Sequence, residues 1–105
     1  MSLVVDFQSI HSVAYRIRTR HPEKDWRTVH TGTHDDDMVP RTLPPLPVGT
    51  LVEYRFLYTD SADEPFVAMI TATQEEDLVE GGRVQVEGEG GEWGVDQLLE
   101  VVEES

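Results

Sequence analysis

The sequence contains no cysteine, a single lysine and no apolar run of the length that crosses a membrane. Without cysteine the fold has neither a disulfide nor a thiolate metal site, so its stability has to come from packing. A bilayer span takes about 20 consecutive apolar residues, and the opening stretch MSLVVDFQSI lacks the basic and apolar regions of a secretion signal. These absences predict a soluble, cytoplasmic protein without a membrane segment.

Negative charge dominates the chain, which carries 21 acidic against 8 basic residues and a net charge of -13. Residues 1–50 are balanced, with six of each, whereas residues 51–105 hold two arginines against fifteen acids. A field of that sign repels phosphate backbones, which argues against nucleic acid as a general partner. The length of 105 residues predicts one domain, residues 1–105, large enough to bury about two-thirds of its unfolded surface.

Side chains alternate between apolar and polar along several stretches, which is the pattern of half-buried strands. In VAYRIRTR, Val13, Tyr15, Ile17 and Thr19 face one way and three arginines the other. DWRTVHTGT has the same β-rich character, and the turn residues of HPEKD between the two segments predict a hairpin. TLVEYRFLYT places Val52, Tyr54, Phe56 and Tyr58 on one face, and FVAMITAT reads as a further strand. The pattern predicts an all-β fold, a small antiparallel sandwich or barrel of six or seven strands.

Three further segments shape that prediction. VPRTLPPLPVG carries four prolines, which cannot donate backbone hydrogen bonds, so it is expected as a crossover or an edge. GGRVQVEGEGGEWGV predicts two short strands joined by a glycine-rich turn, with Val84 and Val86 inward. In VDQLLEVV, Val95, Leu98, Leu99 and Val102 fit the spacing of a short C-terminal helix, and a last strand is the competing prediction.

The stretch LPVGTLVEYRFLYTD resembles the approach to the sixth strand of a fibronectin type III domain. The matching positions are Leu46, Gly49, Thr50, Tyr54, Arg55 and Phe56. Over residues 3–73 the resemblance implies an immunoglobulin-like sandwich, with Phe7 at the family's core tryptophan and SADEPFVAMITAT as its last strand. Val52 replaces the corner tyrosine, and no first strand is present, so the C-terminal hairpin is expected to supply that edge beside residues 4–7.

Residues 48–103 resemble a second family, the small SH3-like or Tudor-like barrels. The resemblance lies in the run from VGTLVEYRF through PFVAMITA to the final QLLEVV. It accounts for the C-terminal third of the chain, whereas the sandwich accounts for the N-terminal part. Neither fold implies catalysis.

The stretch HTGTHDDD, residues 30–37, is the nearest approach to a metal motif. On a strand His30 and His34 would lie about 13 Å apart, but a tight turn at Gly32 would bring their rings together. With Asp35 and Asp37 they would then suit Zn²⁺ or Ni²⁺. The alternative is a solvated loop of Asp35, Asp36 and Asp37, with His30 on the outer face of the hairpin.

Two other sets of side chains are candidate binding sites. Arg16, Arg18 and Arg20 line one strand face near Arg27, which suits an anion or an acidic partner; pairing with Glu53 or with the carboxylates of residues 87–92 is the alternative. Trp26 and Trp93 suit a stacking platform for sugars, or else cover edges of the core.

The composition and motifs together favour a protein that is not an enzyme. No serine occupies a nucleophile-elbow setting, and no cofactor motif is present. We expect a non-catalytic protein-interaction module that binds a protein partner, or a second copy of itself through a sheet edge. The alternatives are a small-ligand or metal-binding domain using the loop at residues 30–37, or carbohydrate binding through the tryptophans.

Overall fold

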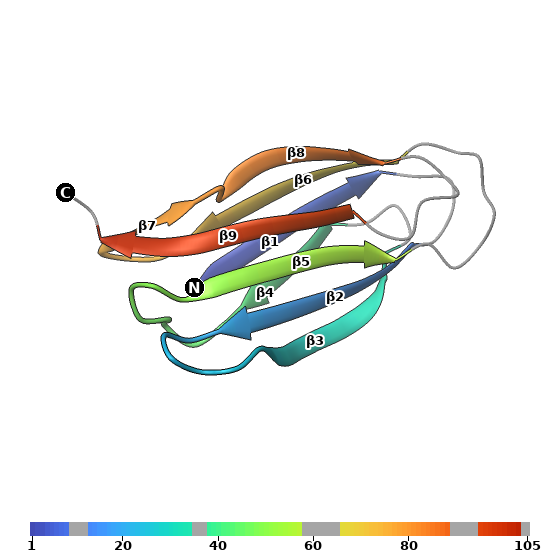
Figure 1. Cartoon of the computed structure of the whole chain (residues 1–105). Coiled ribbons are helices and arrows are strands. Elements are labelled where there is room, and N and C mark those ends of the chain that lie inside the picture. The colour runs from blue at the N-terminus through green and yellow to red at the C-terminus, as the bar shows by residue number, and fades with distance from the viewer. Residues whose placement is uncertain (9–12, 35–37, 58–65, 89–94, 104–105) are drawn as a thin grey trace.

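The computed structural model of the chain describes residues 1–8, 13–34, 38–57, 66–88 and 95–103. Within these ranges nine β-strands form two antiparallel sheets that face each other (Figure 1), so the predicted all-β sandwich is confirmed. The four-stranded sheet has the order β4 (Met38–Thr42), β1 (Ser2–Gln8), β6 (Phe66–Thr73) and β8 (Arg83–Gly88). The five-stranded sheet has the order β3 (Arg27–His34), β2 (Val13–Arg20), β5 (Leu51–Leu57), β9 (Val95–Glu103) and β7 (Asp77–Glu80).

The core is a layer of aromatic and branched side chains between the two sheets. Phe56 of β5 lies 5.0 Å from Phe66 of β6 between ring centroids, and Phe7 of β1 lies 5.4 Å from Phe66. Tyr54 and Tyr15 stack at 5.5 Å within the five-stranded sheet. All five rings are buried, because alternation along each strand directs every second side chain inward. The inward faces predicted for β2 and β5 are confirmed over the described residues, which exclude Tyr58.

The proline-rich stretch begins as an edge strand, as its missing backbone donors predict. β4 contains Pro40 and pairs with β1 alone, so it lies at the edge of the four-stranded sheet. A proline is tolerated there because the second side of the strand has no ladder partner. Beyond Thr42 the chain leaves the sheet and crosses towards β5.

The predicted C-terminal helix is wrong, and the competing prediction of a last strand is confirmed. β9 pairs along β5, with Val52 opposite Leu99. Leu99 and Val101 are buried whereas Leu98 is 53% exposed, so burial follows a period of two. The helical spacing of Val95, Leu98, Leu99 and Val102 is a coincidence that strand pairing overrides.

The predicted hairpin over residues 81–95 is also wrong, because its two strands belong to different sheets. β8 pairs with β6, whereas β9 pairs with β5. Residues 66–73 were expected as the last strand of the sandwich. They form β6 instead, which pairs along the whole of β1, at the position beside residues 4–7 that was predicted for the C-terminal hairpin. The barrel alternative fails for a related reason, since the consecutive strands β5 and β6 lie in different sheets.

Candidate functional site

The outer face of the five-stranded sheet gathers arginines from two neighbouring strands. β2 and β5 are antiparallel, with Arg16 opposite Arg55 and Arg18 opposite Glu53. Because the inward side chains of both strands fill the core, these residues and Arg20 are directed outward. We call Arg16, Arg18, Arg20, Arg55 and the enclosed Glu53 the arginine face.

Glu53 is held at the centre of the arginine face by its neighbours. Arg18 donates from Nε to Oε1 at 2.8 Å and from Nη2 to Oε2 at 2.7 Å, and Arg16 Nη2 lies 3.6 Å from Oε1. The hydrogen bonds from Arg18 lower the pKa of Glu53, against the opposing effect of burial, and the charges of Arg18, Arg16 and Arg55 lower it further. The cross-strand pairing considered for these arginines is therefore present. Four guanidinium groups and one carboxylate of this face come from β2 and β5, and the register of β9 sets Asp96 opposite Arg55 and Glu100 opposite Leu51.

Trp26 extends the arginine face beyond the end of β2. The guanidinium carbon of Arg18 lies 5.0 Å from the centroid of its ring, and that of Arg20 lies 5.8 Å away. A guanidinium over an indole is attracted by the ring quadrupole, which restrains both arginine side chains. The half-buried ring is thus packed against two guanidinium groups, and sugar stacking on it stays a prediction. Trp93, its predicted partner in stacking, lies outside the described residues.

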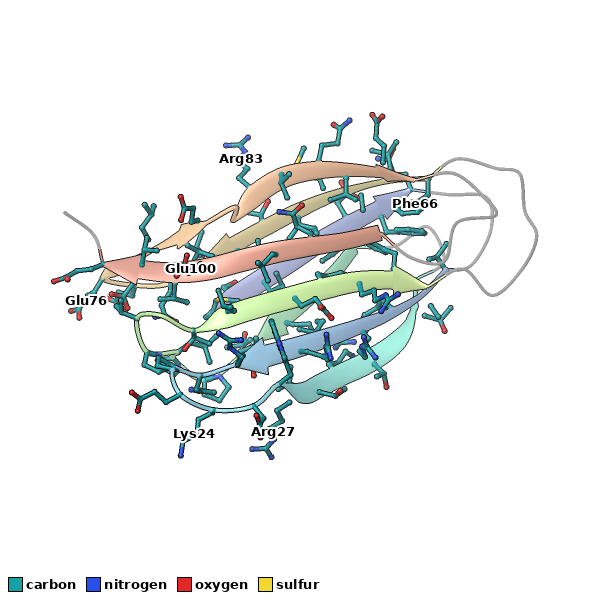
Figure 2. The ribbon with its side chains drawn as sticks, in the orientation of Figure 1. Lys24, Arg27, Phe66, Glu76, Arg83 and Glu100 are labelled. Atoms are coloured by element: carbon teal, nitrogen blue, oxygen red, sulfur yellow. The ribbon has the colours of Figure 1, made fainter. Side chains whose placement is uncertain are left out.

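Arg27 does not belong to the arginine face, although it was grouped with it from the sequence. The register between β2 and β3 shifts between Ile17 and Arg18, and the shift sets Arg27 opposite the inward-facing Thr19. In Figure 2 the Arg27 side chain projects beside Lys24, away from β5. Arg55 takes the fourth place on the face, and the alternation of TLVEYRFLYT already put it on the same side as Glu53.

His30 lies on the inner side of β3 and not on the outer face expected for it. It pairs with Ile17, and its ring lies 5.5 Å from the ring of the buried Tyr15. Arg41 of β4 donates to the Tyr15 hydroxyl at 3.1 Å across the open side of the sandwich. Burial lowers the pKa of His30, and the nearby charge of Arg41 lowers it further, so the imidazole is neutral at pH 7.

The tight turn that a metal site at His30 and His34 requires is not formed at Gly32. β3 runs unbroken through both histidines, and Gly32 pairs with Tyr15 in the ladder. Asp35, Asp36 and Asp37 lie outside the described residues. Across the described ranges, no group of three or more histidine, aspartate or glutamate side chains is arranged to hold a metal ion.

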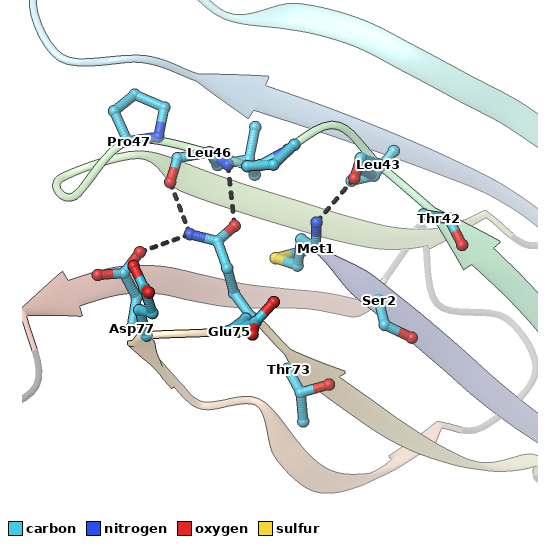
Figure 3. Close-up of a pocket in the computed structure, with 12 residues that line it drawn as sticks. Met1, Ser2, Thr42, Leu43, Leu46, Pro47, Thr73, Glu75 and Asp77 are labelled. Atoms are coloured by element: carbon cyan, nitrogen blue, oxygen red, sulfur yellow. Dashed lines mark hydrogen bonds between the residues drawn. The ribbon is translucent and has the colours of Figure 1, made fainter.

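The segment after β4 separates two surface hollows. The larger, of about 830 Å³, lies between this segment and the β6–β7 turn (Figure 3). There the side-chain amide of Gln74 accepts from Leu46 N at 2.9 Å and donates to Leu46 O at 2.7 Å and to Asp77 Oδ2 at 2.8 Å. The second hollow, of about 420 Å³, has Arg27 and His21 in its wall, and Leu43, Pro45 and Leu46 line both hollows.

The strands that end each sheet are the places where a second copy could add a strand. Several of them carry features that discourage such pairing: β4 has a proline, β7 has four residues, and β8 exposes Arg83, Gln85 and Glu87. β3 is the longer edge of the five-stranded sheet, and the register shift at Ile17 interrupts its regularity.

Comparison with protein-family models, with curated proteins and with solved structures finds no match in any of the three. Over the described residues, no helix has the length and apolar character needed to cross a bilayer. Function is therefore inferred from the surfaces of the described residues, among which the arginine face gathers four of the eight basic side chains of the chain.

Proposed function

We propose that the protein is a non-catalytic interaction module whose arginine face binds an acidic segment of a protein partner. The observation that supports this proposal is the contrast in charge between the arginine face and the rest of the chain. Half of the eight basic residues of a chain with a net charge of -13 lie on β2 and β5, around a single glutamate. Because such a concentration of cations repels itself, it costs stability unless an anion compensates it.

The arrangement of the guanidinium groups favours carboxylates as the bound groups. Each guanidinium is a planar fork that accommodates a carboxylate through two parallel hydrogen bonds. Arg18 already holds Glu53 in this way, and Arg20 is exposed to solvent. Trp26 restrains Arg18 and Arg20 before a ligand arrives, which reduces the entropy lost on binding.

The remaining charge of the chain restricts the size of the acidic partner segment. Outside the arginine face the acids outnumber the bases by a wide margin, so a long polyanion meets repulsion beyond the face. A short acidic segment contacts the face alone. The resulting charge asymmetry also steers such a segment towards one side of the molecule.

The proposal is tested with hexaglutamate as the probe, by calorimetry in 20 mM and 500 mM NaCl. We expect binding to the wild-type chain at low salt that weakens at high salt, because exposed charges are screened. The variant Arg16→Gln/Arg20→Gln is expected to weaken binding at least tenfold. Arg83→Gln, which removes an exposed arginine from β8, serves as the matched control. Equal losses in both variants, or no binding by the wild type, would contradict the proposal.

We also infer that the sandwich is related in arrangement to the fibronectin type III and immunoglobulin-like domains. Two features support this: β1 lies between β4 and β6, and β5 lies between β2 and β9. In immunoglobulin-like sandwiches the second strand likewise lies between the first and the fifth, and the sixth between the third and the seventh. Here β6, which follows β5 in the chain, would take the place of the first strand.

A further inference from the structure

The segment from Leu43 to Val48 shows burial with a period of three. Leu46 is 6% exposed and Leu43 packs against the core, whereas the two residues after each leucine are exposed. The exposed residues are Pro44, Pro45, Pro47 and Val48. A polyproline II helix has three residues per turn, so this pattern places the leucines on one edge against the body and leaves two edges facing solvent.

Hydrogen bonds fix this segment along its length. Leu43 N donates to Met1 O at 2.7 Å, Thr50 N donates to Pro47 O at 3.1 Å, and Gln74 occupies both backbone groups of Leu46. Gln74, which lines the larger hollow, bonds Leu46 on the inner side of the segment. The conformation of the segment is therefore set before any partner binds. Its conformational entropy is lost on folding, so binding does not have to order the segment again.

We propose that residues 43–48 form a docking ridge for a partner domain with an aromatic-lined groove of the SH3 or WW kind. Such grooves bind preformed polyproline II segments by packing aromatic side chains around exposed prolines. Both solvent edges of the ridge carry proline rings, and the hollows on either side give a groove wall room to approach. Residues 42–52 hold no charged side chain, which is unusual in so acidic a chain and suits contact with apolar rings.

The flanks of the ridge determine the orientation of the partner. Arg27 and His21 border the smaller hollow, whereas Glu75, Glu76 and Asp77 border the larger one. A groove whose two walls differ in charge therefore fits in one direction. The phenylalanine, tyrosine and tryptophan side chains in the described part of this chain are buried, apart from Trp26, which is half-buried and packed against Arg18 and Arg20. The described residues thus present no exposed aromatic groove, and the occupant we propose is a different protein that carries one.

The test is a binding array of SH3 and WW domains probed with the purified chain, followed by calorimetry with the domain that binds most tightly. We expect a micromolar dissociation constant for at least one domain. The variant Pro44→Ala/Pro47→Ala is expected to weaken binding at least tenfold. Pro22→Ala, which changes an exposed proline in the β2–β3 turn, is the matched control and is expected to stay within twofold.

A second variant separates loss of docking from loss of folding. Gln74→Ala keeps every proline but releases Leu46, and we expect it to weaken binding severalfold while the β-sheet circular dichroism is retained. The proposal is overturned if no domain of either class binds tighter than 1 mM, or if the double proline variant binds as the wild type does. Sedimentation showing a dimer that this variant abolishes would also overturn it, since the occupant would then be a second copy. None of these results bears on the arginine face, because the two surfaces share no residue.

Discussion

Replacing Glu53 by glutamine is expected to destabilise the fold. The Glu53 side chain is 13% exposed and its partner Arg18 is 27% exposed, so the pair is shielded from most of the solvent. A hydrogen bond to a charged group contributes about 1.5–3 kcal/mol, and the remaining solvent access places this pair towards the lower end. We expect a loss of about 2 kcal/mol in the free energy of unfolding. For a domain of this size that corresponds to a fall of about 8 °C in Tm.

The same substitution is expected to strengthen binding of an acidic peptide. Glutamine keeps the shape of Glu53 and removes the negative charge at the centre of the arginine face. Two unit charges about 4–5 Å apart in a water-like medium interact with about 1 kcal/mol. Removing that repulsion should tighten hexaglutamate binding about fivefold, so stability and affinity change in opposite directions.

Both effects are measured on one preparation, by thermal circular dichroism and by calorimetry at pH 7. Glu75→Gln, which removes an exposed acid of the β6–β7 turn, is the control. Because the pKa of Glu53 in the folded state lies below the ordinary glutamate value of 4.5, the pair stabilises the protein fully above that pH. The contribution of the pair is lost as the pH falls through the lowered pKa. The Tm values of the wild type and of Glu53→Gln should therefore converge in acid. A Tm within 1 °C of the wild type at pH 7, or weaker hexaglutamate binding, would refute the reasoning.

Three further predictions concern the packing around Tyr15 and the support of the ridge. Gly32→Ala places a Cβ about 2.7 Å from the Tyr15 hydroxyl, so we expect a loss of about 2 kcal/mol by urea denaturation; an unchanged midpoint would mean that the ring moves freely. The pKa of His30 is lower in the folded state than its ordinary value of 6.5, so on acidification His30 is protonated in the unfolded chain before it is protonated in the folded one. The free energy of unfolding therefore falls as the pH drops below 6.5. His30→Gln should flatten that decline between pH 7.5 and 5.5, and a variant with the same slope as the wild type would contradict the assignment. Gln74→Ala should lower the free energy of unfolding by about 1–3 kcal/mol and speed hydrogen exchange at the Leu46 amide, which donates to the Gln74 side chain. Unchanged exchange at Leu46 would show that this bond does not fix the ridge.

Alternation along the sequence determines which side chains are buried but not which strands are neighbours. Residues 13–20 and 66–73 were predicted as strands, and their bounds match β2 and β6. The partners of residues 66–73 and 83–88 were predicted wrongly, because a period of two specifies an inward face and leaves the pairing open. The proline-rich stretch was placed correctly at an edge, since the missing N–H group excludes a central position.

The composition of the arginine face was predictable only where the register was regular. Arg16 and Arg18 follow from alternation within one strand, and Arg55 follows from the same rule applied to β5. Arg27 was misplaced because one extra residue in β3 changes which side chains share a face, and no turn signal announces that shift. The ridge depends on the contact between Gln74 and Leu46, 28 positions apart in the sequence, which no local pattern contains.

The most direct test of the arginine face as the binding surface is amide chemical-shift mapping of the ¹⁵N-labelled chain during titration with hexaglutamate at low salt. We predict that the largest shifts fall on residues 16–20 and 53–55, together with the indole N–H of Trp26, and that they vanish in 500 mM NaCl. Shifts centred on β6 and β8, or no saturable shift anywhere, would contradict the proposed function.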